Sequence, residues 1–226
     1  MEENNMRLSC VDCGKISCKK QDGQYPAFCD TSSLTREEID ELARLYMDPE
    51  NNRIAKASAE IEGSFYGKYT RLEETVEFAR RIGAKKLGIA TCVGLLEESR
   101  ILAKILRLNG FEVFSAVCKT ASMTKTETLG LDPEYTSIGN VMCNPIQQAR
   151  LMNKEQVDLV ILMGLCVGHD SLFYKYCERT VTTLVVKDRV LGNNPVQALY
   201  LTRSYYRRLL ESPVGANGRN PSDRSI

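Results

Sequence analysis

The chain has 226 residues, of which 43% are hydrophobic and 26% are charged, and these proportions are ordinary for a globular protein. A net charge of +1 gives no electrostatic reason to expect nucleic acid or an anionic membrane surface as a partner. The apolar stretches are too short to cross a bilayer, and the polar start of the chain lacks the apolar core of a signal peptide. We therefore expect a cytoplasmic globular protein that binds no nucleic acid and no membrane.

Nine cysteines are many for such a protein, and they fall into two sets. Four lie close together near the start of the chain, and five are spread over the remainder. In a reducing compartment, clustered cysteines are more often metal ligands or reactive thiols than disulfides. The two sets are therefore interpreted separately.

The first set, which we call the tetrad, consists of Cys10, Cys13, Cys18 and Cys29. Residues 1–32 contain too few apolar side chains to build a core, so another interaction has to hold this segment together. The Cys-x2-Cys spacing and the thiolate ligands are typical of a structural zinc knuckle, and an iron–sulfur cluster uses the same ligand type. The sequence predicts a metal-binding knuckle over 1–32, with zinc or an iron–sulfur cluster as cofactor. Four unmodified thiols in a loose segment are the alternative.

Helical signals follow over residues 33–65, where Thr35 and Glu38 have the spacing of a capping box and Pro49 is placed to open a second helix. Thr70 and Glu73 form another capping box at the start of the next region. From there the pattern alternates between strands and helices. We expect strands at 86–92, 111–118, 157–166 and 181–187, helices at 95–109, from 145, from about 170 and at 194–211, and a long loop at 119–137.

Strands separated by helices indicate βαβ units and a mainly parallel sheet. The sequence thus predicts an α/β fold, with a Rossmann-like three-layer domain over 66–211. The Pro-, Gly-, Asn- and Ser-rich tail, 212–226, is predicted to be disordered.

Two short motifs occur in the same order in both halves of this domain, which indicates an internal duplication. The first is Cys-Val-Gly at the end of a predicted strand, and the second is Asn-Pro-[Ile/Val]-Gln at a predicted helix start. The residues concerned are Cys92 to Gly94 and Asn144 to Gln147 in one half, and Cys166 to Gly168 and Asn194 to Gln197 in the other.

In open parallel sheets, ligands bind beyond the carboxyl ends of the strands. We therefore expect Cys92, Cys143, Cys166 and His169, the only histidine, to converge at one such site. Gly94 and Gly168 would allow a ligand to approach closely, and helix starts at Asn144 and Asn194 would favour a small anion.

This second set can act in three ways: as thiolate nucleophiles, as a metal site, or as ligands of a cluster with an open iron position. Cys92 and Cys166 are the candidate nucleophiles, and His169 is a candidate ligand or general acid/base. The alternative is structural, because cysteine is often a small buried hydrophobe at strand ends, and a histidine near a helix start can serve as a cap.

Weaker candidates lie nearby. Cys118 ends a predicted strand beside Lys119, whose charge can lower a thiol pKa, and Cys177 has the position of a core helix residue. Lys187, Asp188 and Arg189 are placed to contact an anion or a carboxylate, although solvated surface charge is the commoner explanation for such a run.

The chain resembles a family of uncharacterised prokaryotic proteins that is grouped under a domain-of-unknown-function label and described as metal-binding. The resemblance rests on the Cys10-x2-Cys13 element and on the stretches 143–149, 164–170 and 186–190, the last leading to Asn194 and Pro195. It covers nearly the whole chain. It implies metal binding in general and names no substrate.

Two hypotheses of function follow. In the first, a metal-binding protein carries out redox, sulfur or cluster chemistry at its second thiol-rich site. In the second, a non-enzymatic sensor binds a small anionic ligand, and the knuckle is structural. A nucleotide-using enzyme is disfavoured because neither a Gly-x-Gly-x-x-Gly nor a P-loop motif is present.

Overall fold

The computed structural model describes residues 7–214, so the tail predicted to be disordered lies almost entirely outside the described residues. The chain divides into two compact units, Met1–Glu60 and Ile61–Ile226, and each is described by itself. Among residues 7–214, no helix is both long and apolar enough to cross a membrane.

The first unit consists of short helical turns followed by longer helices. Its elements are η1 (Cys10–Asp12), α1 (Ser17–Lys20), α2 (Asp30–Ser33), α3 (Arg36–Met47) and the start of α4 (Pro49–Phe65). The predicted capping box opens α3: the Glu38 amide donates to Thr35 Oγ1 at 3.2 Å, and the Thr35 amide donates to Glu38 Oε2 at 2.8 Å. The tetrad lies on the short turns that precede this helix.

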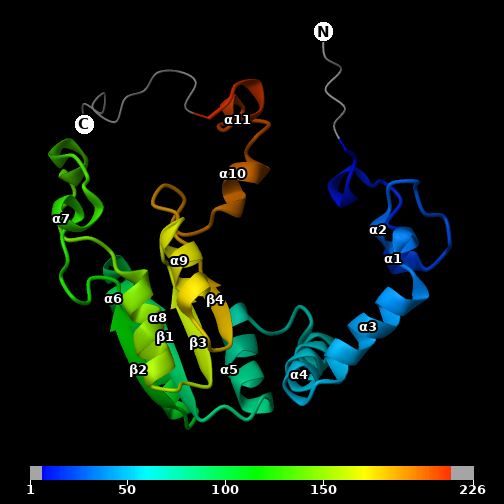
Figure 1. Cartoon of the computed structure of the whole chain (residues 1–226), viewed down its shortest axis with the longest axis horizontal. Helices are drawn as coiled ribbons and strands as arrows, with labels where there is room; N and C mark the ends of the chain where they lie inside the picture. The colour runs from blue at the N-terminus through cyan, green and yellow to red at the C-terminus, as the bar shows by residue number, and fades with distance from the viewer. Residues whose placement is uncertain (1–6, 215–226) are drawn as a thin grey trace. The chain divides into compact units, whose positions relative to one another are not determined.

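The second unit is built on a four-stranded parallel sheet in the order β2-β1-β3-β4, which confirms the predicted α/β fold (Figure 1). Every residue of β3 is buried, as expected for a central strand with helices on both faces. The strands are β1 (Lys86–Thr91), β2 (Glu112–Val117), β3 (Leu159–Met163) and β4 (Val181–Val185).

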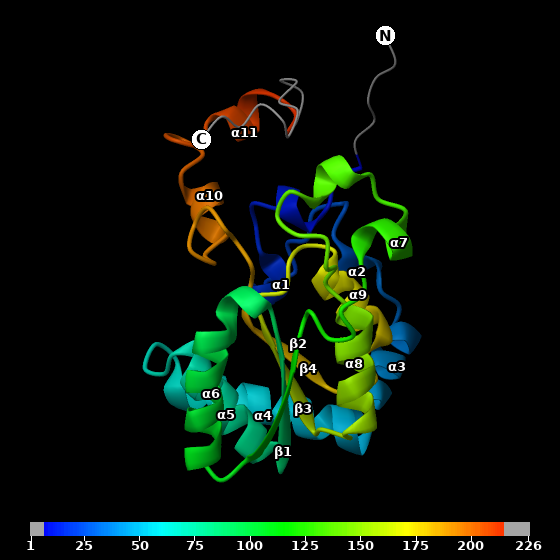
Figure 2. The same cartoon turned by 90° about the vertical axis from the view of Figure 1, so that its left-hand side faces the viewer.

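Helices cover both faces of this sheet and complete three layers (Figure 2). On one face lie α5 (Arg71–Arg81) and α6 (Leu96–Leu108), and on the other lie α8 (Pro145–Lys154) and α9 (His169–Tyr176). Between the sheet and α8, the core includes Met152, Val157 and Phe173, all fully buried. This burial holds the carboxyl ends of the strands in fixed positions.

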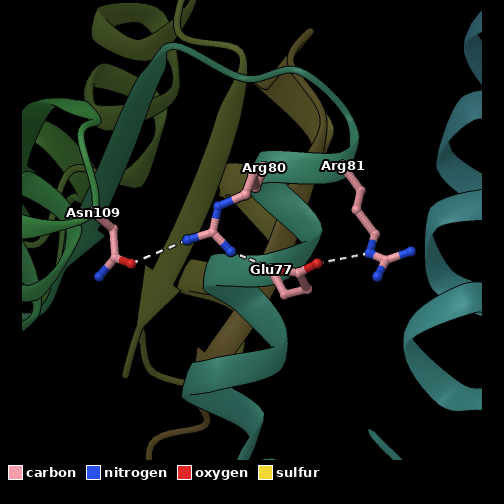
Figure 3. A network of polar contacts seen from close by, with 4 residues as sticks. All are labelled: Glu77, Arg80, Arg81 and Asn109. Carbon is pink, nitrogen blue, oxygen red and sulfur yellow. Dashed lines mark hydrogen bonds and ion pairs between the residues drawn. The ribbon is translucent and has the colours of Figure 1, made fainter. Parts of the chain in front are cut away.

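A polar network ties α5 to the end of α6 (Figure 3). Arg80 donates to Asn109 Oδ1 at 3.1 Å and also pairs with Glu77. Arg81 Nε donates to Glu77 Oε1 at 2.8 Å. The network fixes the helix that leads into β1.

The strand order reverses between β1 and β3. The chain passes from β1 outward to β2, and from β3 outward to β4 on the opposite side, while β1 and β3 pair directly, with Thr91 opposite Met163. Such a reversal is the usual position of a ligand site in open α/β sheets. The two Cys-Val-Gly motifs follow the two strands that flank this point.

Two predicted elements were wrong in detail. The long loop at 119–137 contains α7 (Lys125–Leu129) and η3 (Pro133–Thr136). The single helix predicted for 194–211 is instead two short helices, α10 (Val196–Tyr200) and α11 (Arg208–Glu211), separated by turns. The physical reason is exposure: Leu199 and Leu210 remain 66% and 74% exposed, and a helix without a packed apolar face is marginal in water.

Candidate functional site

Cysteines from four segments lie around the carboxyl ends of the central strands. Cys92 follows β1 directly and Cys118 follows β2 directly, while Cys143 precedes the N-cap of α8 and Cys166 lies shortly after β3. We call these four residues with His169 the strand-end site. Cys92 and Cys166 thus lie where the strand ends were predicted.

Backbone hydrogen bonds extend beyond the strands and fix three of these cysteines. The Cys92 amide donates to the carbonyl of Met163 at 3.0 Å, and the Cys118 amide donates to that of Thr91 at 2.9 Å. The Asn144 amide donates to the carbonyl of Cys118 at 2.7 Å. The positions of Cys92 and Cys118 are therefore set by the sheet, and Cys143 is held beside them through its neighbour Asn144.

Cys118 lies at the centre of the site. Its Sγ is 3.7 Å from Cys143 Sγ and accepts a hydrogen bond from the Val93 amide at 3.3 Å. Cys118 is only 2% exposed, whereas Cys92 and Cys143 are half-buried. Sequence reasoning ranked Cys118 below the others. The available signal was its position immediately after a strand, which matches that of Cys92.

The three thiols share protons unequally. A hydrogen bond from Cys118 is the main cause that lowers the pKa of Cys92 to about 5, helped by the Gly94 amide and the Lys187 charge. Hydrogen bonding between Cys143 and Cys118 is likewise the main cause that lowers the pKa of Cys143 to about 4. Hydrogen bonding to these two neighbours, together with burial, raises the pKa of Cys118 far above its usual range. These directions favour a proton on Cys118 over one on Cys92 or Cys143.

His169 interacts with Cys166 and with Cys143, which come from different halves of the domain. It begins α9, and its amide donates to the carbonyl of Cys166 at 2.9 Å. Its side chain is the second cause that lowers the pKa of Cys143, through a hydrogen bond and through charge. Lys119 adds a further cationic contribution to Cys143, while its Nζ donates to the carbonyl of Val141 at 2.6 Å.

Cys166 has different surroundings. Burial raises the pKa of Cys166, and the opposing contribution comes first from Arg189, whose Nη2 donates to Cys166 Sγ at 2.9 Å. Asp188 holds the loop that carries Arg189, because Asp188 Oδ1 accepts the amides of Val190 and Leu191 at 2.8 Å each. The run 187–189, which the sequence marked as a possible anion contact, thus lies against the site.

The Lys187 side chain lies against Gly164, the residue that directly follows β3. A Cβ at Gly164 would lie 3.4 Å from Lys187 Nζ and 2.2 Å from Leu95 Cδ1. Gly164 also has φ of +65°, a region that favours glycine. Glycine is therefore needed here for two reasons, and it lets the lysine approach the strand ends.

The remaining predicted residues have mixed outcomes. Asn144 caps α8 as predicted: its Oδ1 accepts the Gln147 amide at 3.0 Å. The same prediction for Asn194 was wrong, because the N-cap of α10 is Pro195, and Asn194 contributes only its carbonyl, to the Gln197 amide. Gly94 and Gly168 were predicted to allow close approach of a ligand. Gly168 is the N-cap of α9, and a Cβ added there would meet no atom within 4 Å. A Cβ added at Gly94 would lie 3.9 Å from Cys92 Sγ.

Gln148 binds the ends of the two strands that carry Cys92 and Cys118, and it was not predicted from the sequence. It is fully buried, and its Nε2 donates to the carbonyls of Thr91 and Ala116 at 3.1 and 2.7 Å. These carbonyls belong to the ends of β1 and β2, so one amide ties together the strands that present Cys92 and Cys118. Its Oε1 has no hydrogen-bond partner among the described residues.

Cys177 is not part of this site. It is the C-cap of α9, at the opposite end of that helix from His169, and its Sγ lies 3.8 Å from the carbonyl of Arg179. It packs against the buried core, as its sequence position indicated.

The tetrad forms a second candidate site, in the first unit. All four of its cysteines line one cavity of about 90 Å³. Cys10 Sγ lies 3.7 Å from Asp30 Oδ2, and the negative charge of Asp30 is the main cause that raises the pKa of Cys10. Within residues 7–214, no three His, Cys, Asp or Glu side chains form a ready-made metal-binding group, so neither site is pre-assembled around a metal.

Comparison with known proteins identifies the family. A model described as "Protein of unknown function (DUF1847)" matches residues 29–184, which is more than half of the chain. The chain belongs to the DUF1847 family. It is also similar to the uncharacterized protein MJ0455 of Methanocaldococcus jannaschii, with 42% identity over 204 residues, covering 90% of this chain and 99% of that protein. The DUF1847 match includes the whole strand-end site but, within the tetrad, only Cys29.

Proposed function

We propose that this protein is a cytoplasmic metal-binding protein that carries out thiol chemistry, redox or sulfur transfer, at its strand-end site. In this proposal the tetrad holds zinc or an iron–sulfur cluster, and the strand-end thiols react with a substrate. The observation that carries the proposal is the convergence of Cys92, Cys118 and Cys143, from three separate segments, at the carboxyl ends of β1 and β2, next to the point where the strand order reverses.

The tetrad fits a metal in ligand type and number. Four thiols line one small cavity, in a segment whose turns are too short to be stable alone. A metal held by four thiolates would supply the folding free energy that such a segment lacks. Apart from Ser17, the residues of the three short helical elements are exposed or half-exposed, so apolar packing contributes little here.

The strand-end site fits thiol chemistry. A thiolate, not a thiol, is the nucleophile, and Cys92 and Cys143 have pKa values lowered to about 5 and about 4. Both are half-buried and so partly open to solvent. Lys187 and Arg189 add positive charge beside them, which favours thiolates and anionic substrates alike.

Metal and acid-labile sulfide analysis of protein purified without oxygen tests the metal part. We expect about one zinc per chain and no colour, or iron with sulfide and a brown protein. Cys13→Ser is expected to lose the metal, and Cys118→Ser is expected to retain it. Absence of metal in the wild type, or its loss in Cys118→Ser alone, would contradict the assignment to the tetrad.

A second candidate function is the binding of a small anion without chemistry. The observation that favours it is the pair of cations, Lys187 and Arg189, held at the strand ends by Gly164 and by the Asp188 turn. Calorimetric titration with sulfate and phosphate distinguishes the two. A pure sensor would bind equally well in Cys92→Ser and lose binding in Arg189→Ala, and its thiols would show no activity towards substrates.

A further inference from the structure

Cys118 and Cys143 are close enough to form a disulfide after a small movement. Their Sγ atoms are 3.7 Å apart, compared with about 2.05 Å in a disulfide. The Asn144 amide, directly after Cys143, donates to the Cys118 carbonyl at 2.7 Å and so holds the two backbones together. Because the backbones are already adjacent, what remains is an approach of the two Sγ atoms by about 1.65 Å.

The two thiols differ in accessibility. Cys118 is 2% exposed and accepts the Val93 amide, whereas Cys143 is half-buried beside His169. An incoming molecule therefore reaches Cys143 before it reaches Cys118. This order is the arrangement expected of an attacking thiolate and a resolving thiol.

We propose that Cys143 and Cys118 form a dithiol–disulfide couple that reduces small disulfides bearing carboxylate groups. The inference rests on the thiol chemistry proposed above and assigns its substrate class and the role of each residue. Cys143 attacks the substrate, and Cys118 resolves the mixed disulfide.

The reaction balances as two thiol–disulfide exchanges. The Cys143 thiolate attacks one sulfur of a substrate R–S–S–R, forming a Cys143–S–S–R bond and releasing one R–S⁻. Cys118 then attacks Cys143 Sγ, which forms the Cys118–Cys143 bond and releases the second R–S⁻, and the Cys118 proton passes to a released thiolate. The substrate gains two electrons, and the protein loses two. An external thiol of the reducing compartment returns the pair to the dithiol state.

The preference for a carboxylate comes from the charges around the site. The Lys187 side chain lies against Gly164 at the strand ends, and Arg189 Nη2 donates to Cys166, the one Arg189 hydrogen bond found among residues 7–214. A guanidinium has five N–H groups, so it can bind a carboxylate as well. The nearest acidic group on the same loop, Asp188, is engaged with the backbone amides of Val190 and Leu191.

The test treats full-length reduced protein, without oxygen, with three disulfides of different charge. These are 3,3′-dithiodipropionate, which is an anion, 2-hydroxyethyl disulfide, which is neutral, and cystamine, which is a cation. Disulfide-bonded peptides are mapped by mass spectrometry without reduction. We expect a Cys118–Cys143 bond, formed at least about tenfold faster with the anion than with the cation at low salt.

Variants identify the role of each thiol. Cys118→Ser and Cys118→Ala are expected to stop at a mixed disulfide on Cys143 and to release one thiol instead of two. Cys177→Ser, which alters a half-buried thiol of the same unit outside the strand-end site, is the matched control and should behave as wild type. Circular dichroism would test whether each variant is folded. The second Cys118 variant provides an independent test if the first fails to fold.

Three results would overturn the inference: a persistent mixed disulfide on Cys143 in the wild type, a bond from Cys118 to Cys92 in place of Cys143, or a faster reaction with cystamine. The proposed function fails separately. It fails if Cys92 and Cys143 are inert to iodoacetamide near neutral pH, whereas the inference alone fails if they are alkylated readily but form no internal disulfide.

Discussion

The two sets of cysteines differ in what holds them. The tetrad lies on short helical turns with one buried residue, Ser17, whereas the strand-end thiols lie around a sheet whose central strands, β1 and β3, are buried. A segment without a core needs a ligand to hold its thiols in place. Thiols fixed by a sheet can instead hydrogen-bond one another, which separates their pKa values. One chain thus presents cysteine in two physical settings that favour different chemistry.

The largest difference between the two settings is expected on removal of the metal that we propose for the tetrad. Structural zinc in small knuckles contributes about 10–16 kcal/mol of apparent binding free energy. A chelator should therefore remove amide protection from residues 10–33 and leave the strands of the second unit protected, as measured by hydrogen exchange. Cys13→Ser should reproduce the effect. Loss of protection in β1 or β3 would contradict the division.

Gln148→Leu should destabilise the second unit by about 1–3 kcal/mol, because it removes two buried hydrogen bonds, those that Gln148 Nε2 donates to the carbonyls of Thr91 and Ala116. Gln147→Leu, on the half-exposed face of the same helix, is the matched control and should change stability by less than about 0.5 kcal/mol. Urea denaturation followed by circular dichroism measures both. Equal effects of the two changes would show that Gln148 does not tie the strand ends together.

His169→Ala should raise the pKa of Cys143, because it removes a hydrogen bond and a charge that favour the thiolate. A thiol alkylates only as thiolate, so the midpoint of the curve of alkylation rate against pH should move up by about one pH unit, or about 1.4 kcal/mol. The midpoint for Cys92 should move less, since its pKa is lowered mainly by Cys118. A midpoint for Cys143 that stays in place would exclude the histidine from the site.

The smallest effect is expected for Arg189→Ala. The guanidinium opposes the burial that raises the pKa of Cys166, so its loss should raise that pKa further and slow alkylation of Cys166. Arg189 is exposed, and solvent screens its charge, so the decrease should be only about twofold to fivefold. Arg203→Ala is the control. A faster reaction of Cys166 in Arg189→Ala would show that the arginine shields the thiol instead.

Local sequence signals predicted much of the fold. The capping box of Thr35 and Glu38 and that of Thr70 and Glu73 form as expected, because each depends on residues within one helical turn. The same Asn-Pro pair gave opposite results at Asn144 and Asn194. The helix after Asn144 buries a face against the sheet, whereas Val196, Leu199 and Tyr200 remain exposed, so local capping signals alone could not decide the second case.

The predicted strand ends indicated the positions of Cys92 and Cys166, but the contact between Cys118 and Cys143 could not be predicted from the sequence. The strand order, which places β2 beside β1, depends on packing of the whole domain. Cys118 and Cys143 are 25 positions apart in the chain, and the length of the segment between them gives no indication of where it returns. Gln148 likewise resembles any helix residue until the two carbonyls above it are known.

Peptide-resolved alkylation of protein purified without oxygen tests the contrast between the two sets most directly. With iodoacetamide at about pH 6, Cys92 and Cys143 should react within minutes, because their pKa values lie near 5 and 4. Cys10, Cys13, Cys18 and Cys29 should stay unlabelled until a chelator is added. Rapid labelling of the tetrad without chelator, together with unreactive Cys92 and Cys143, would contradict the account.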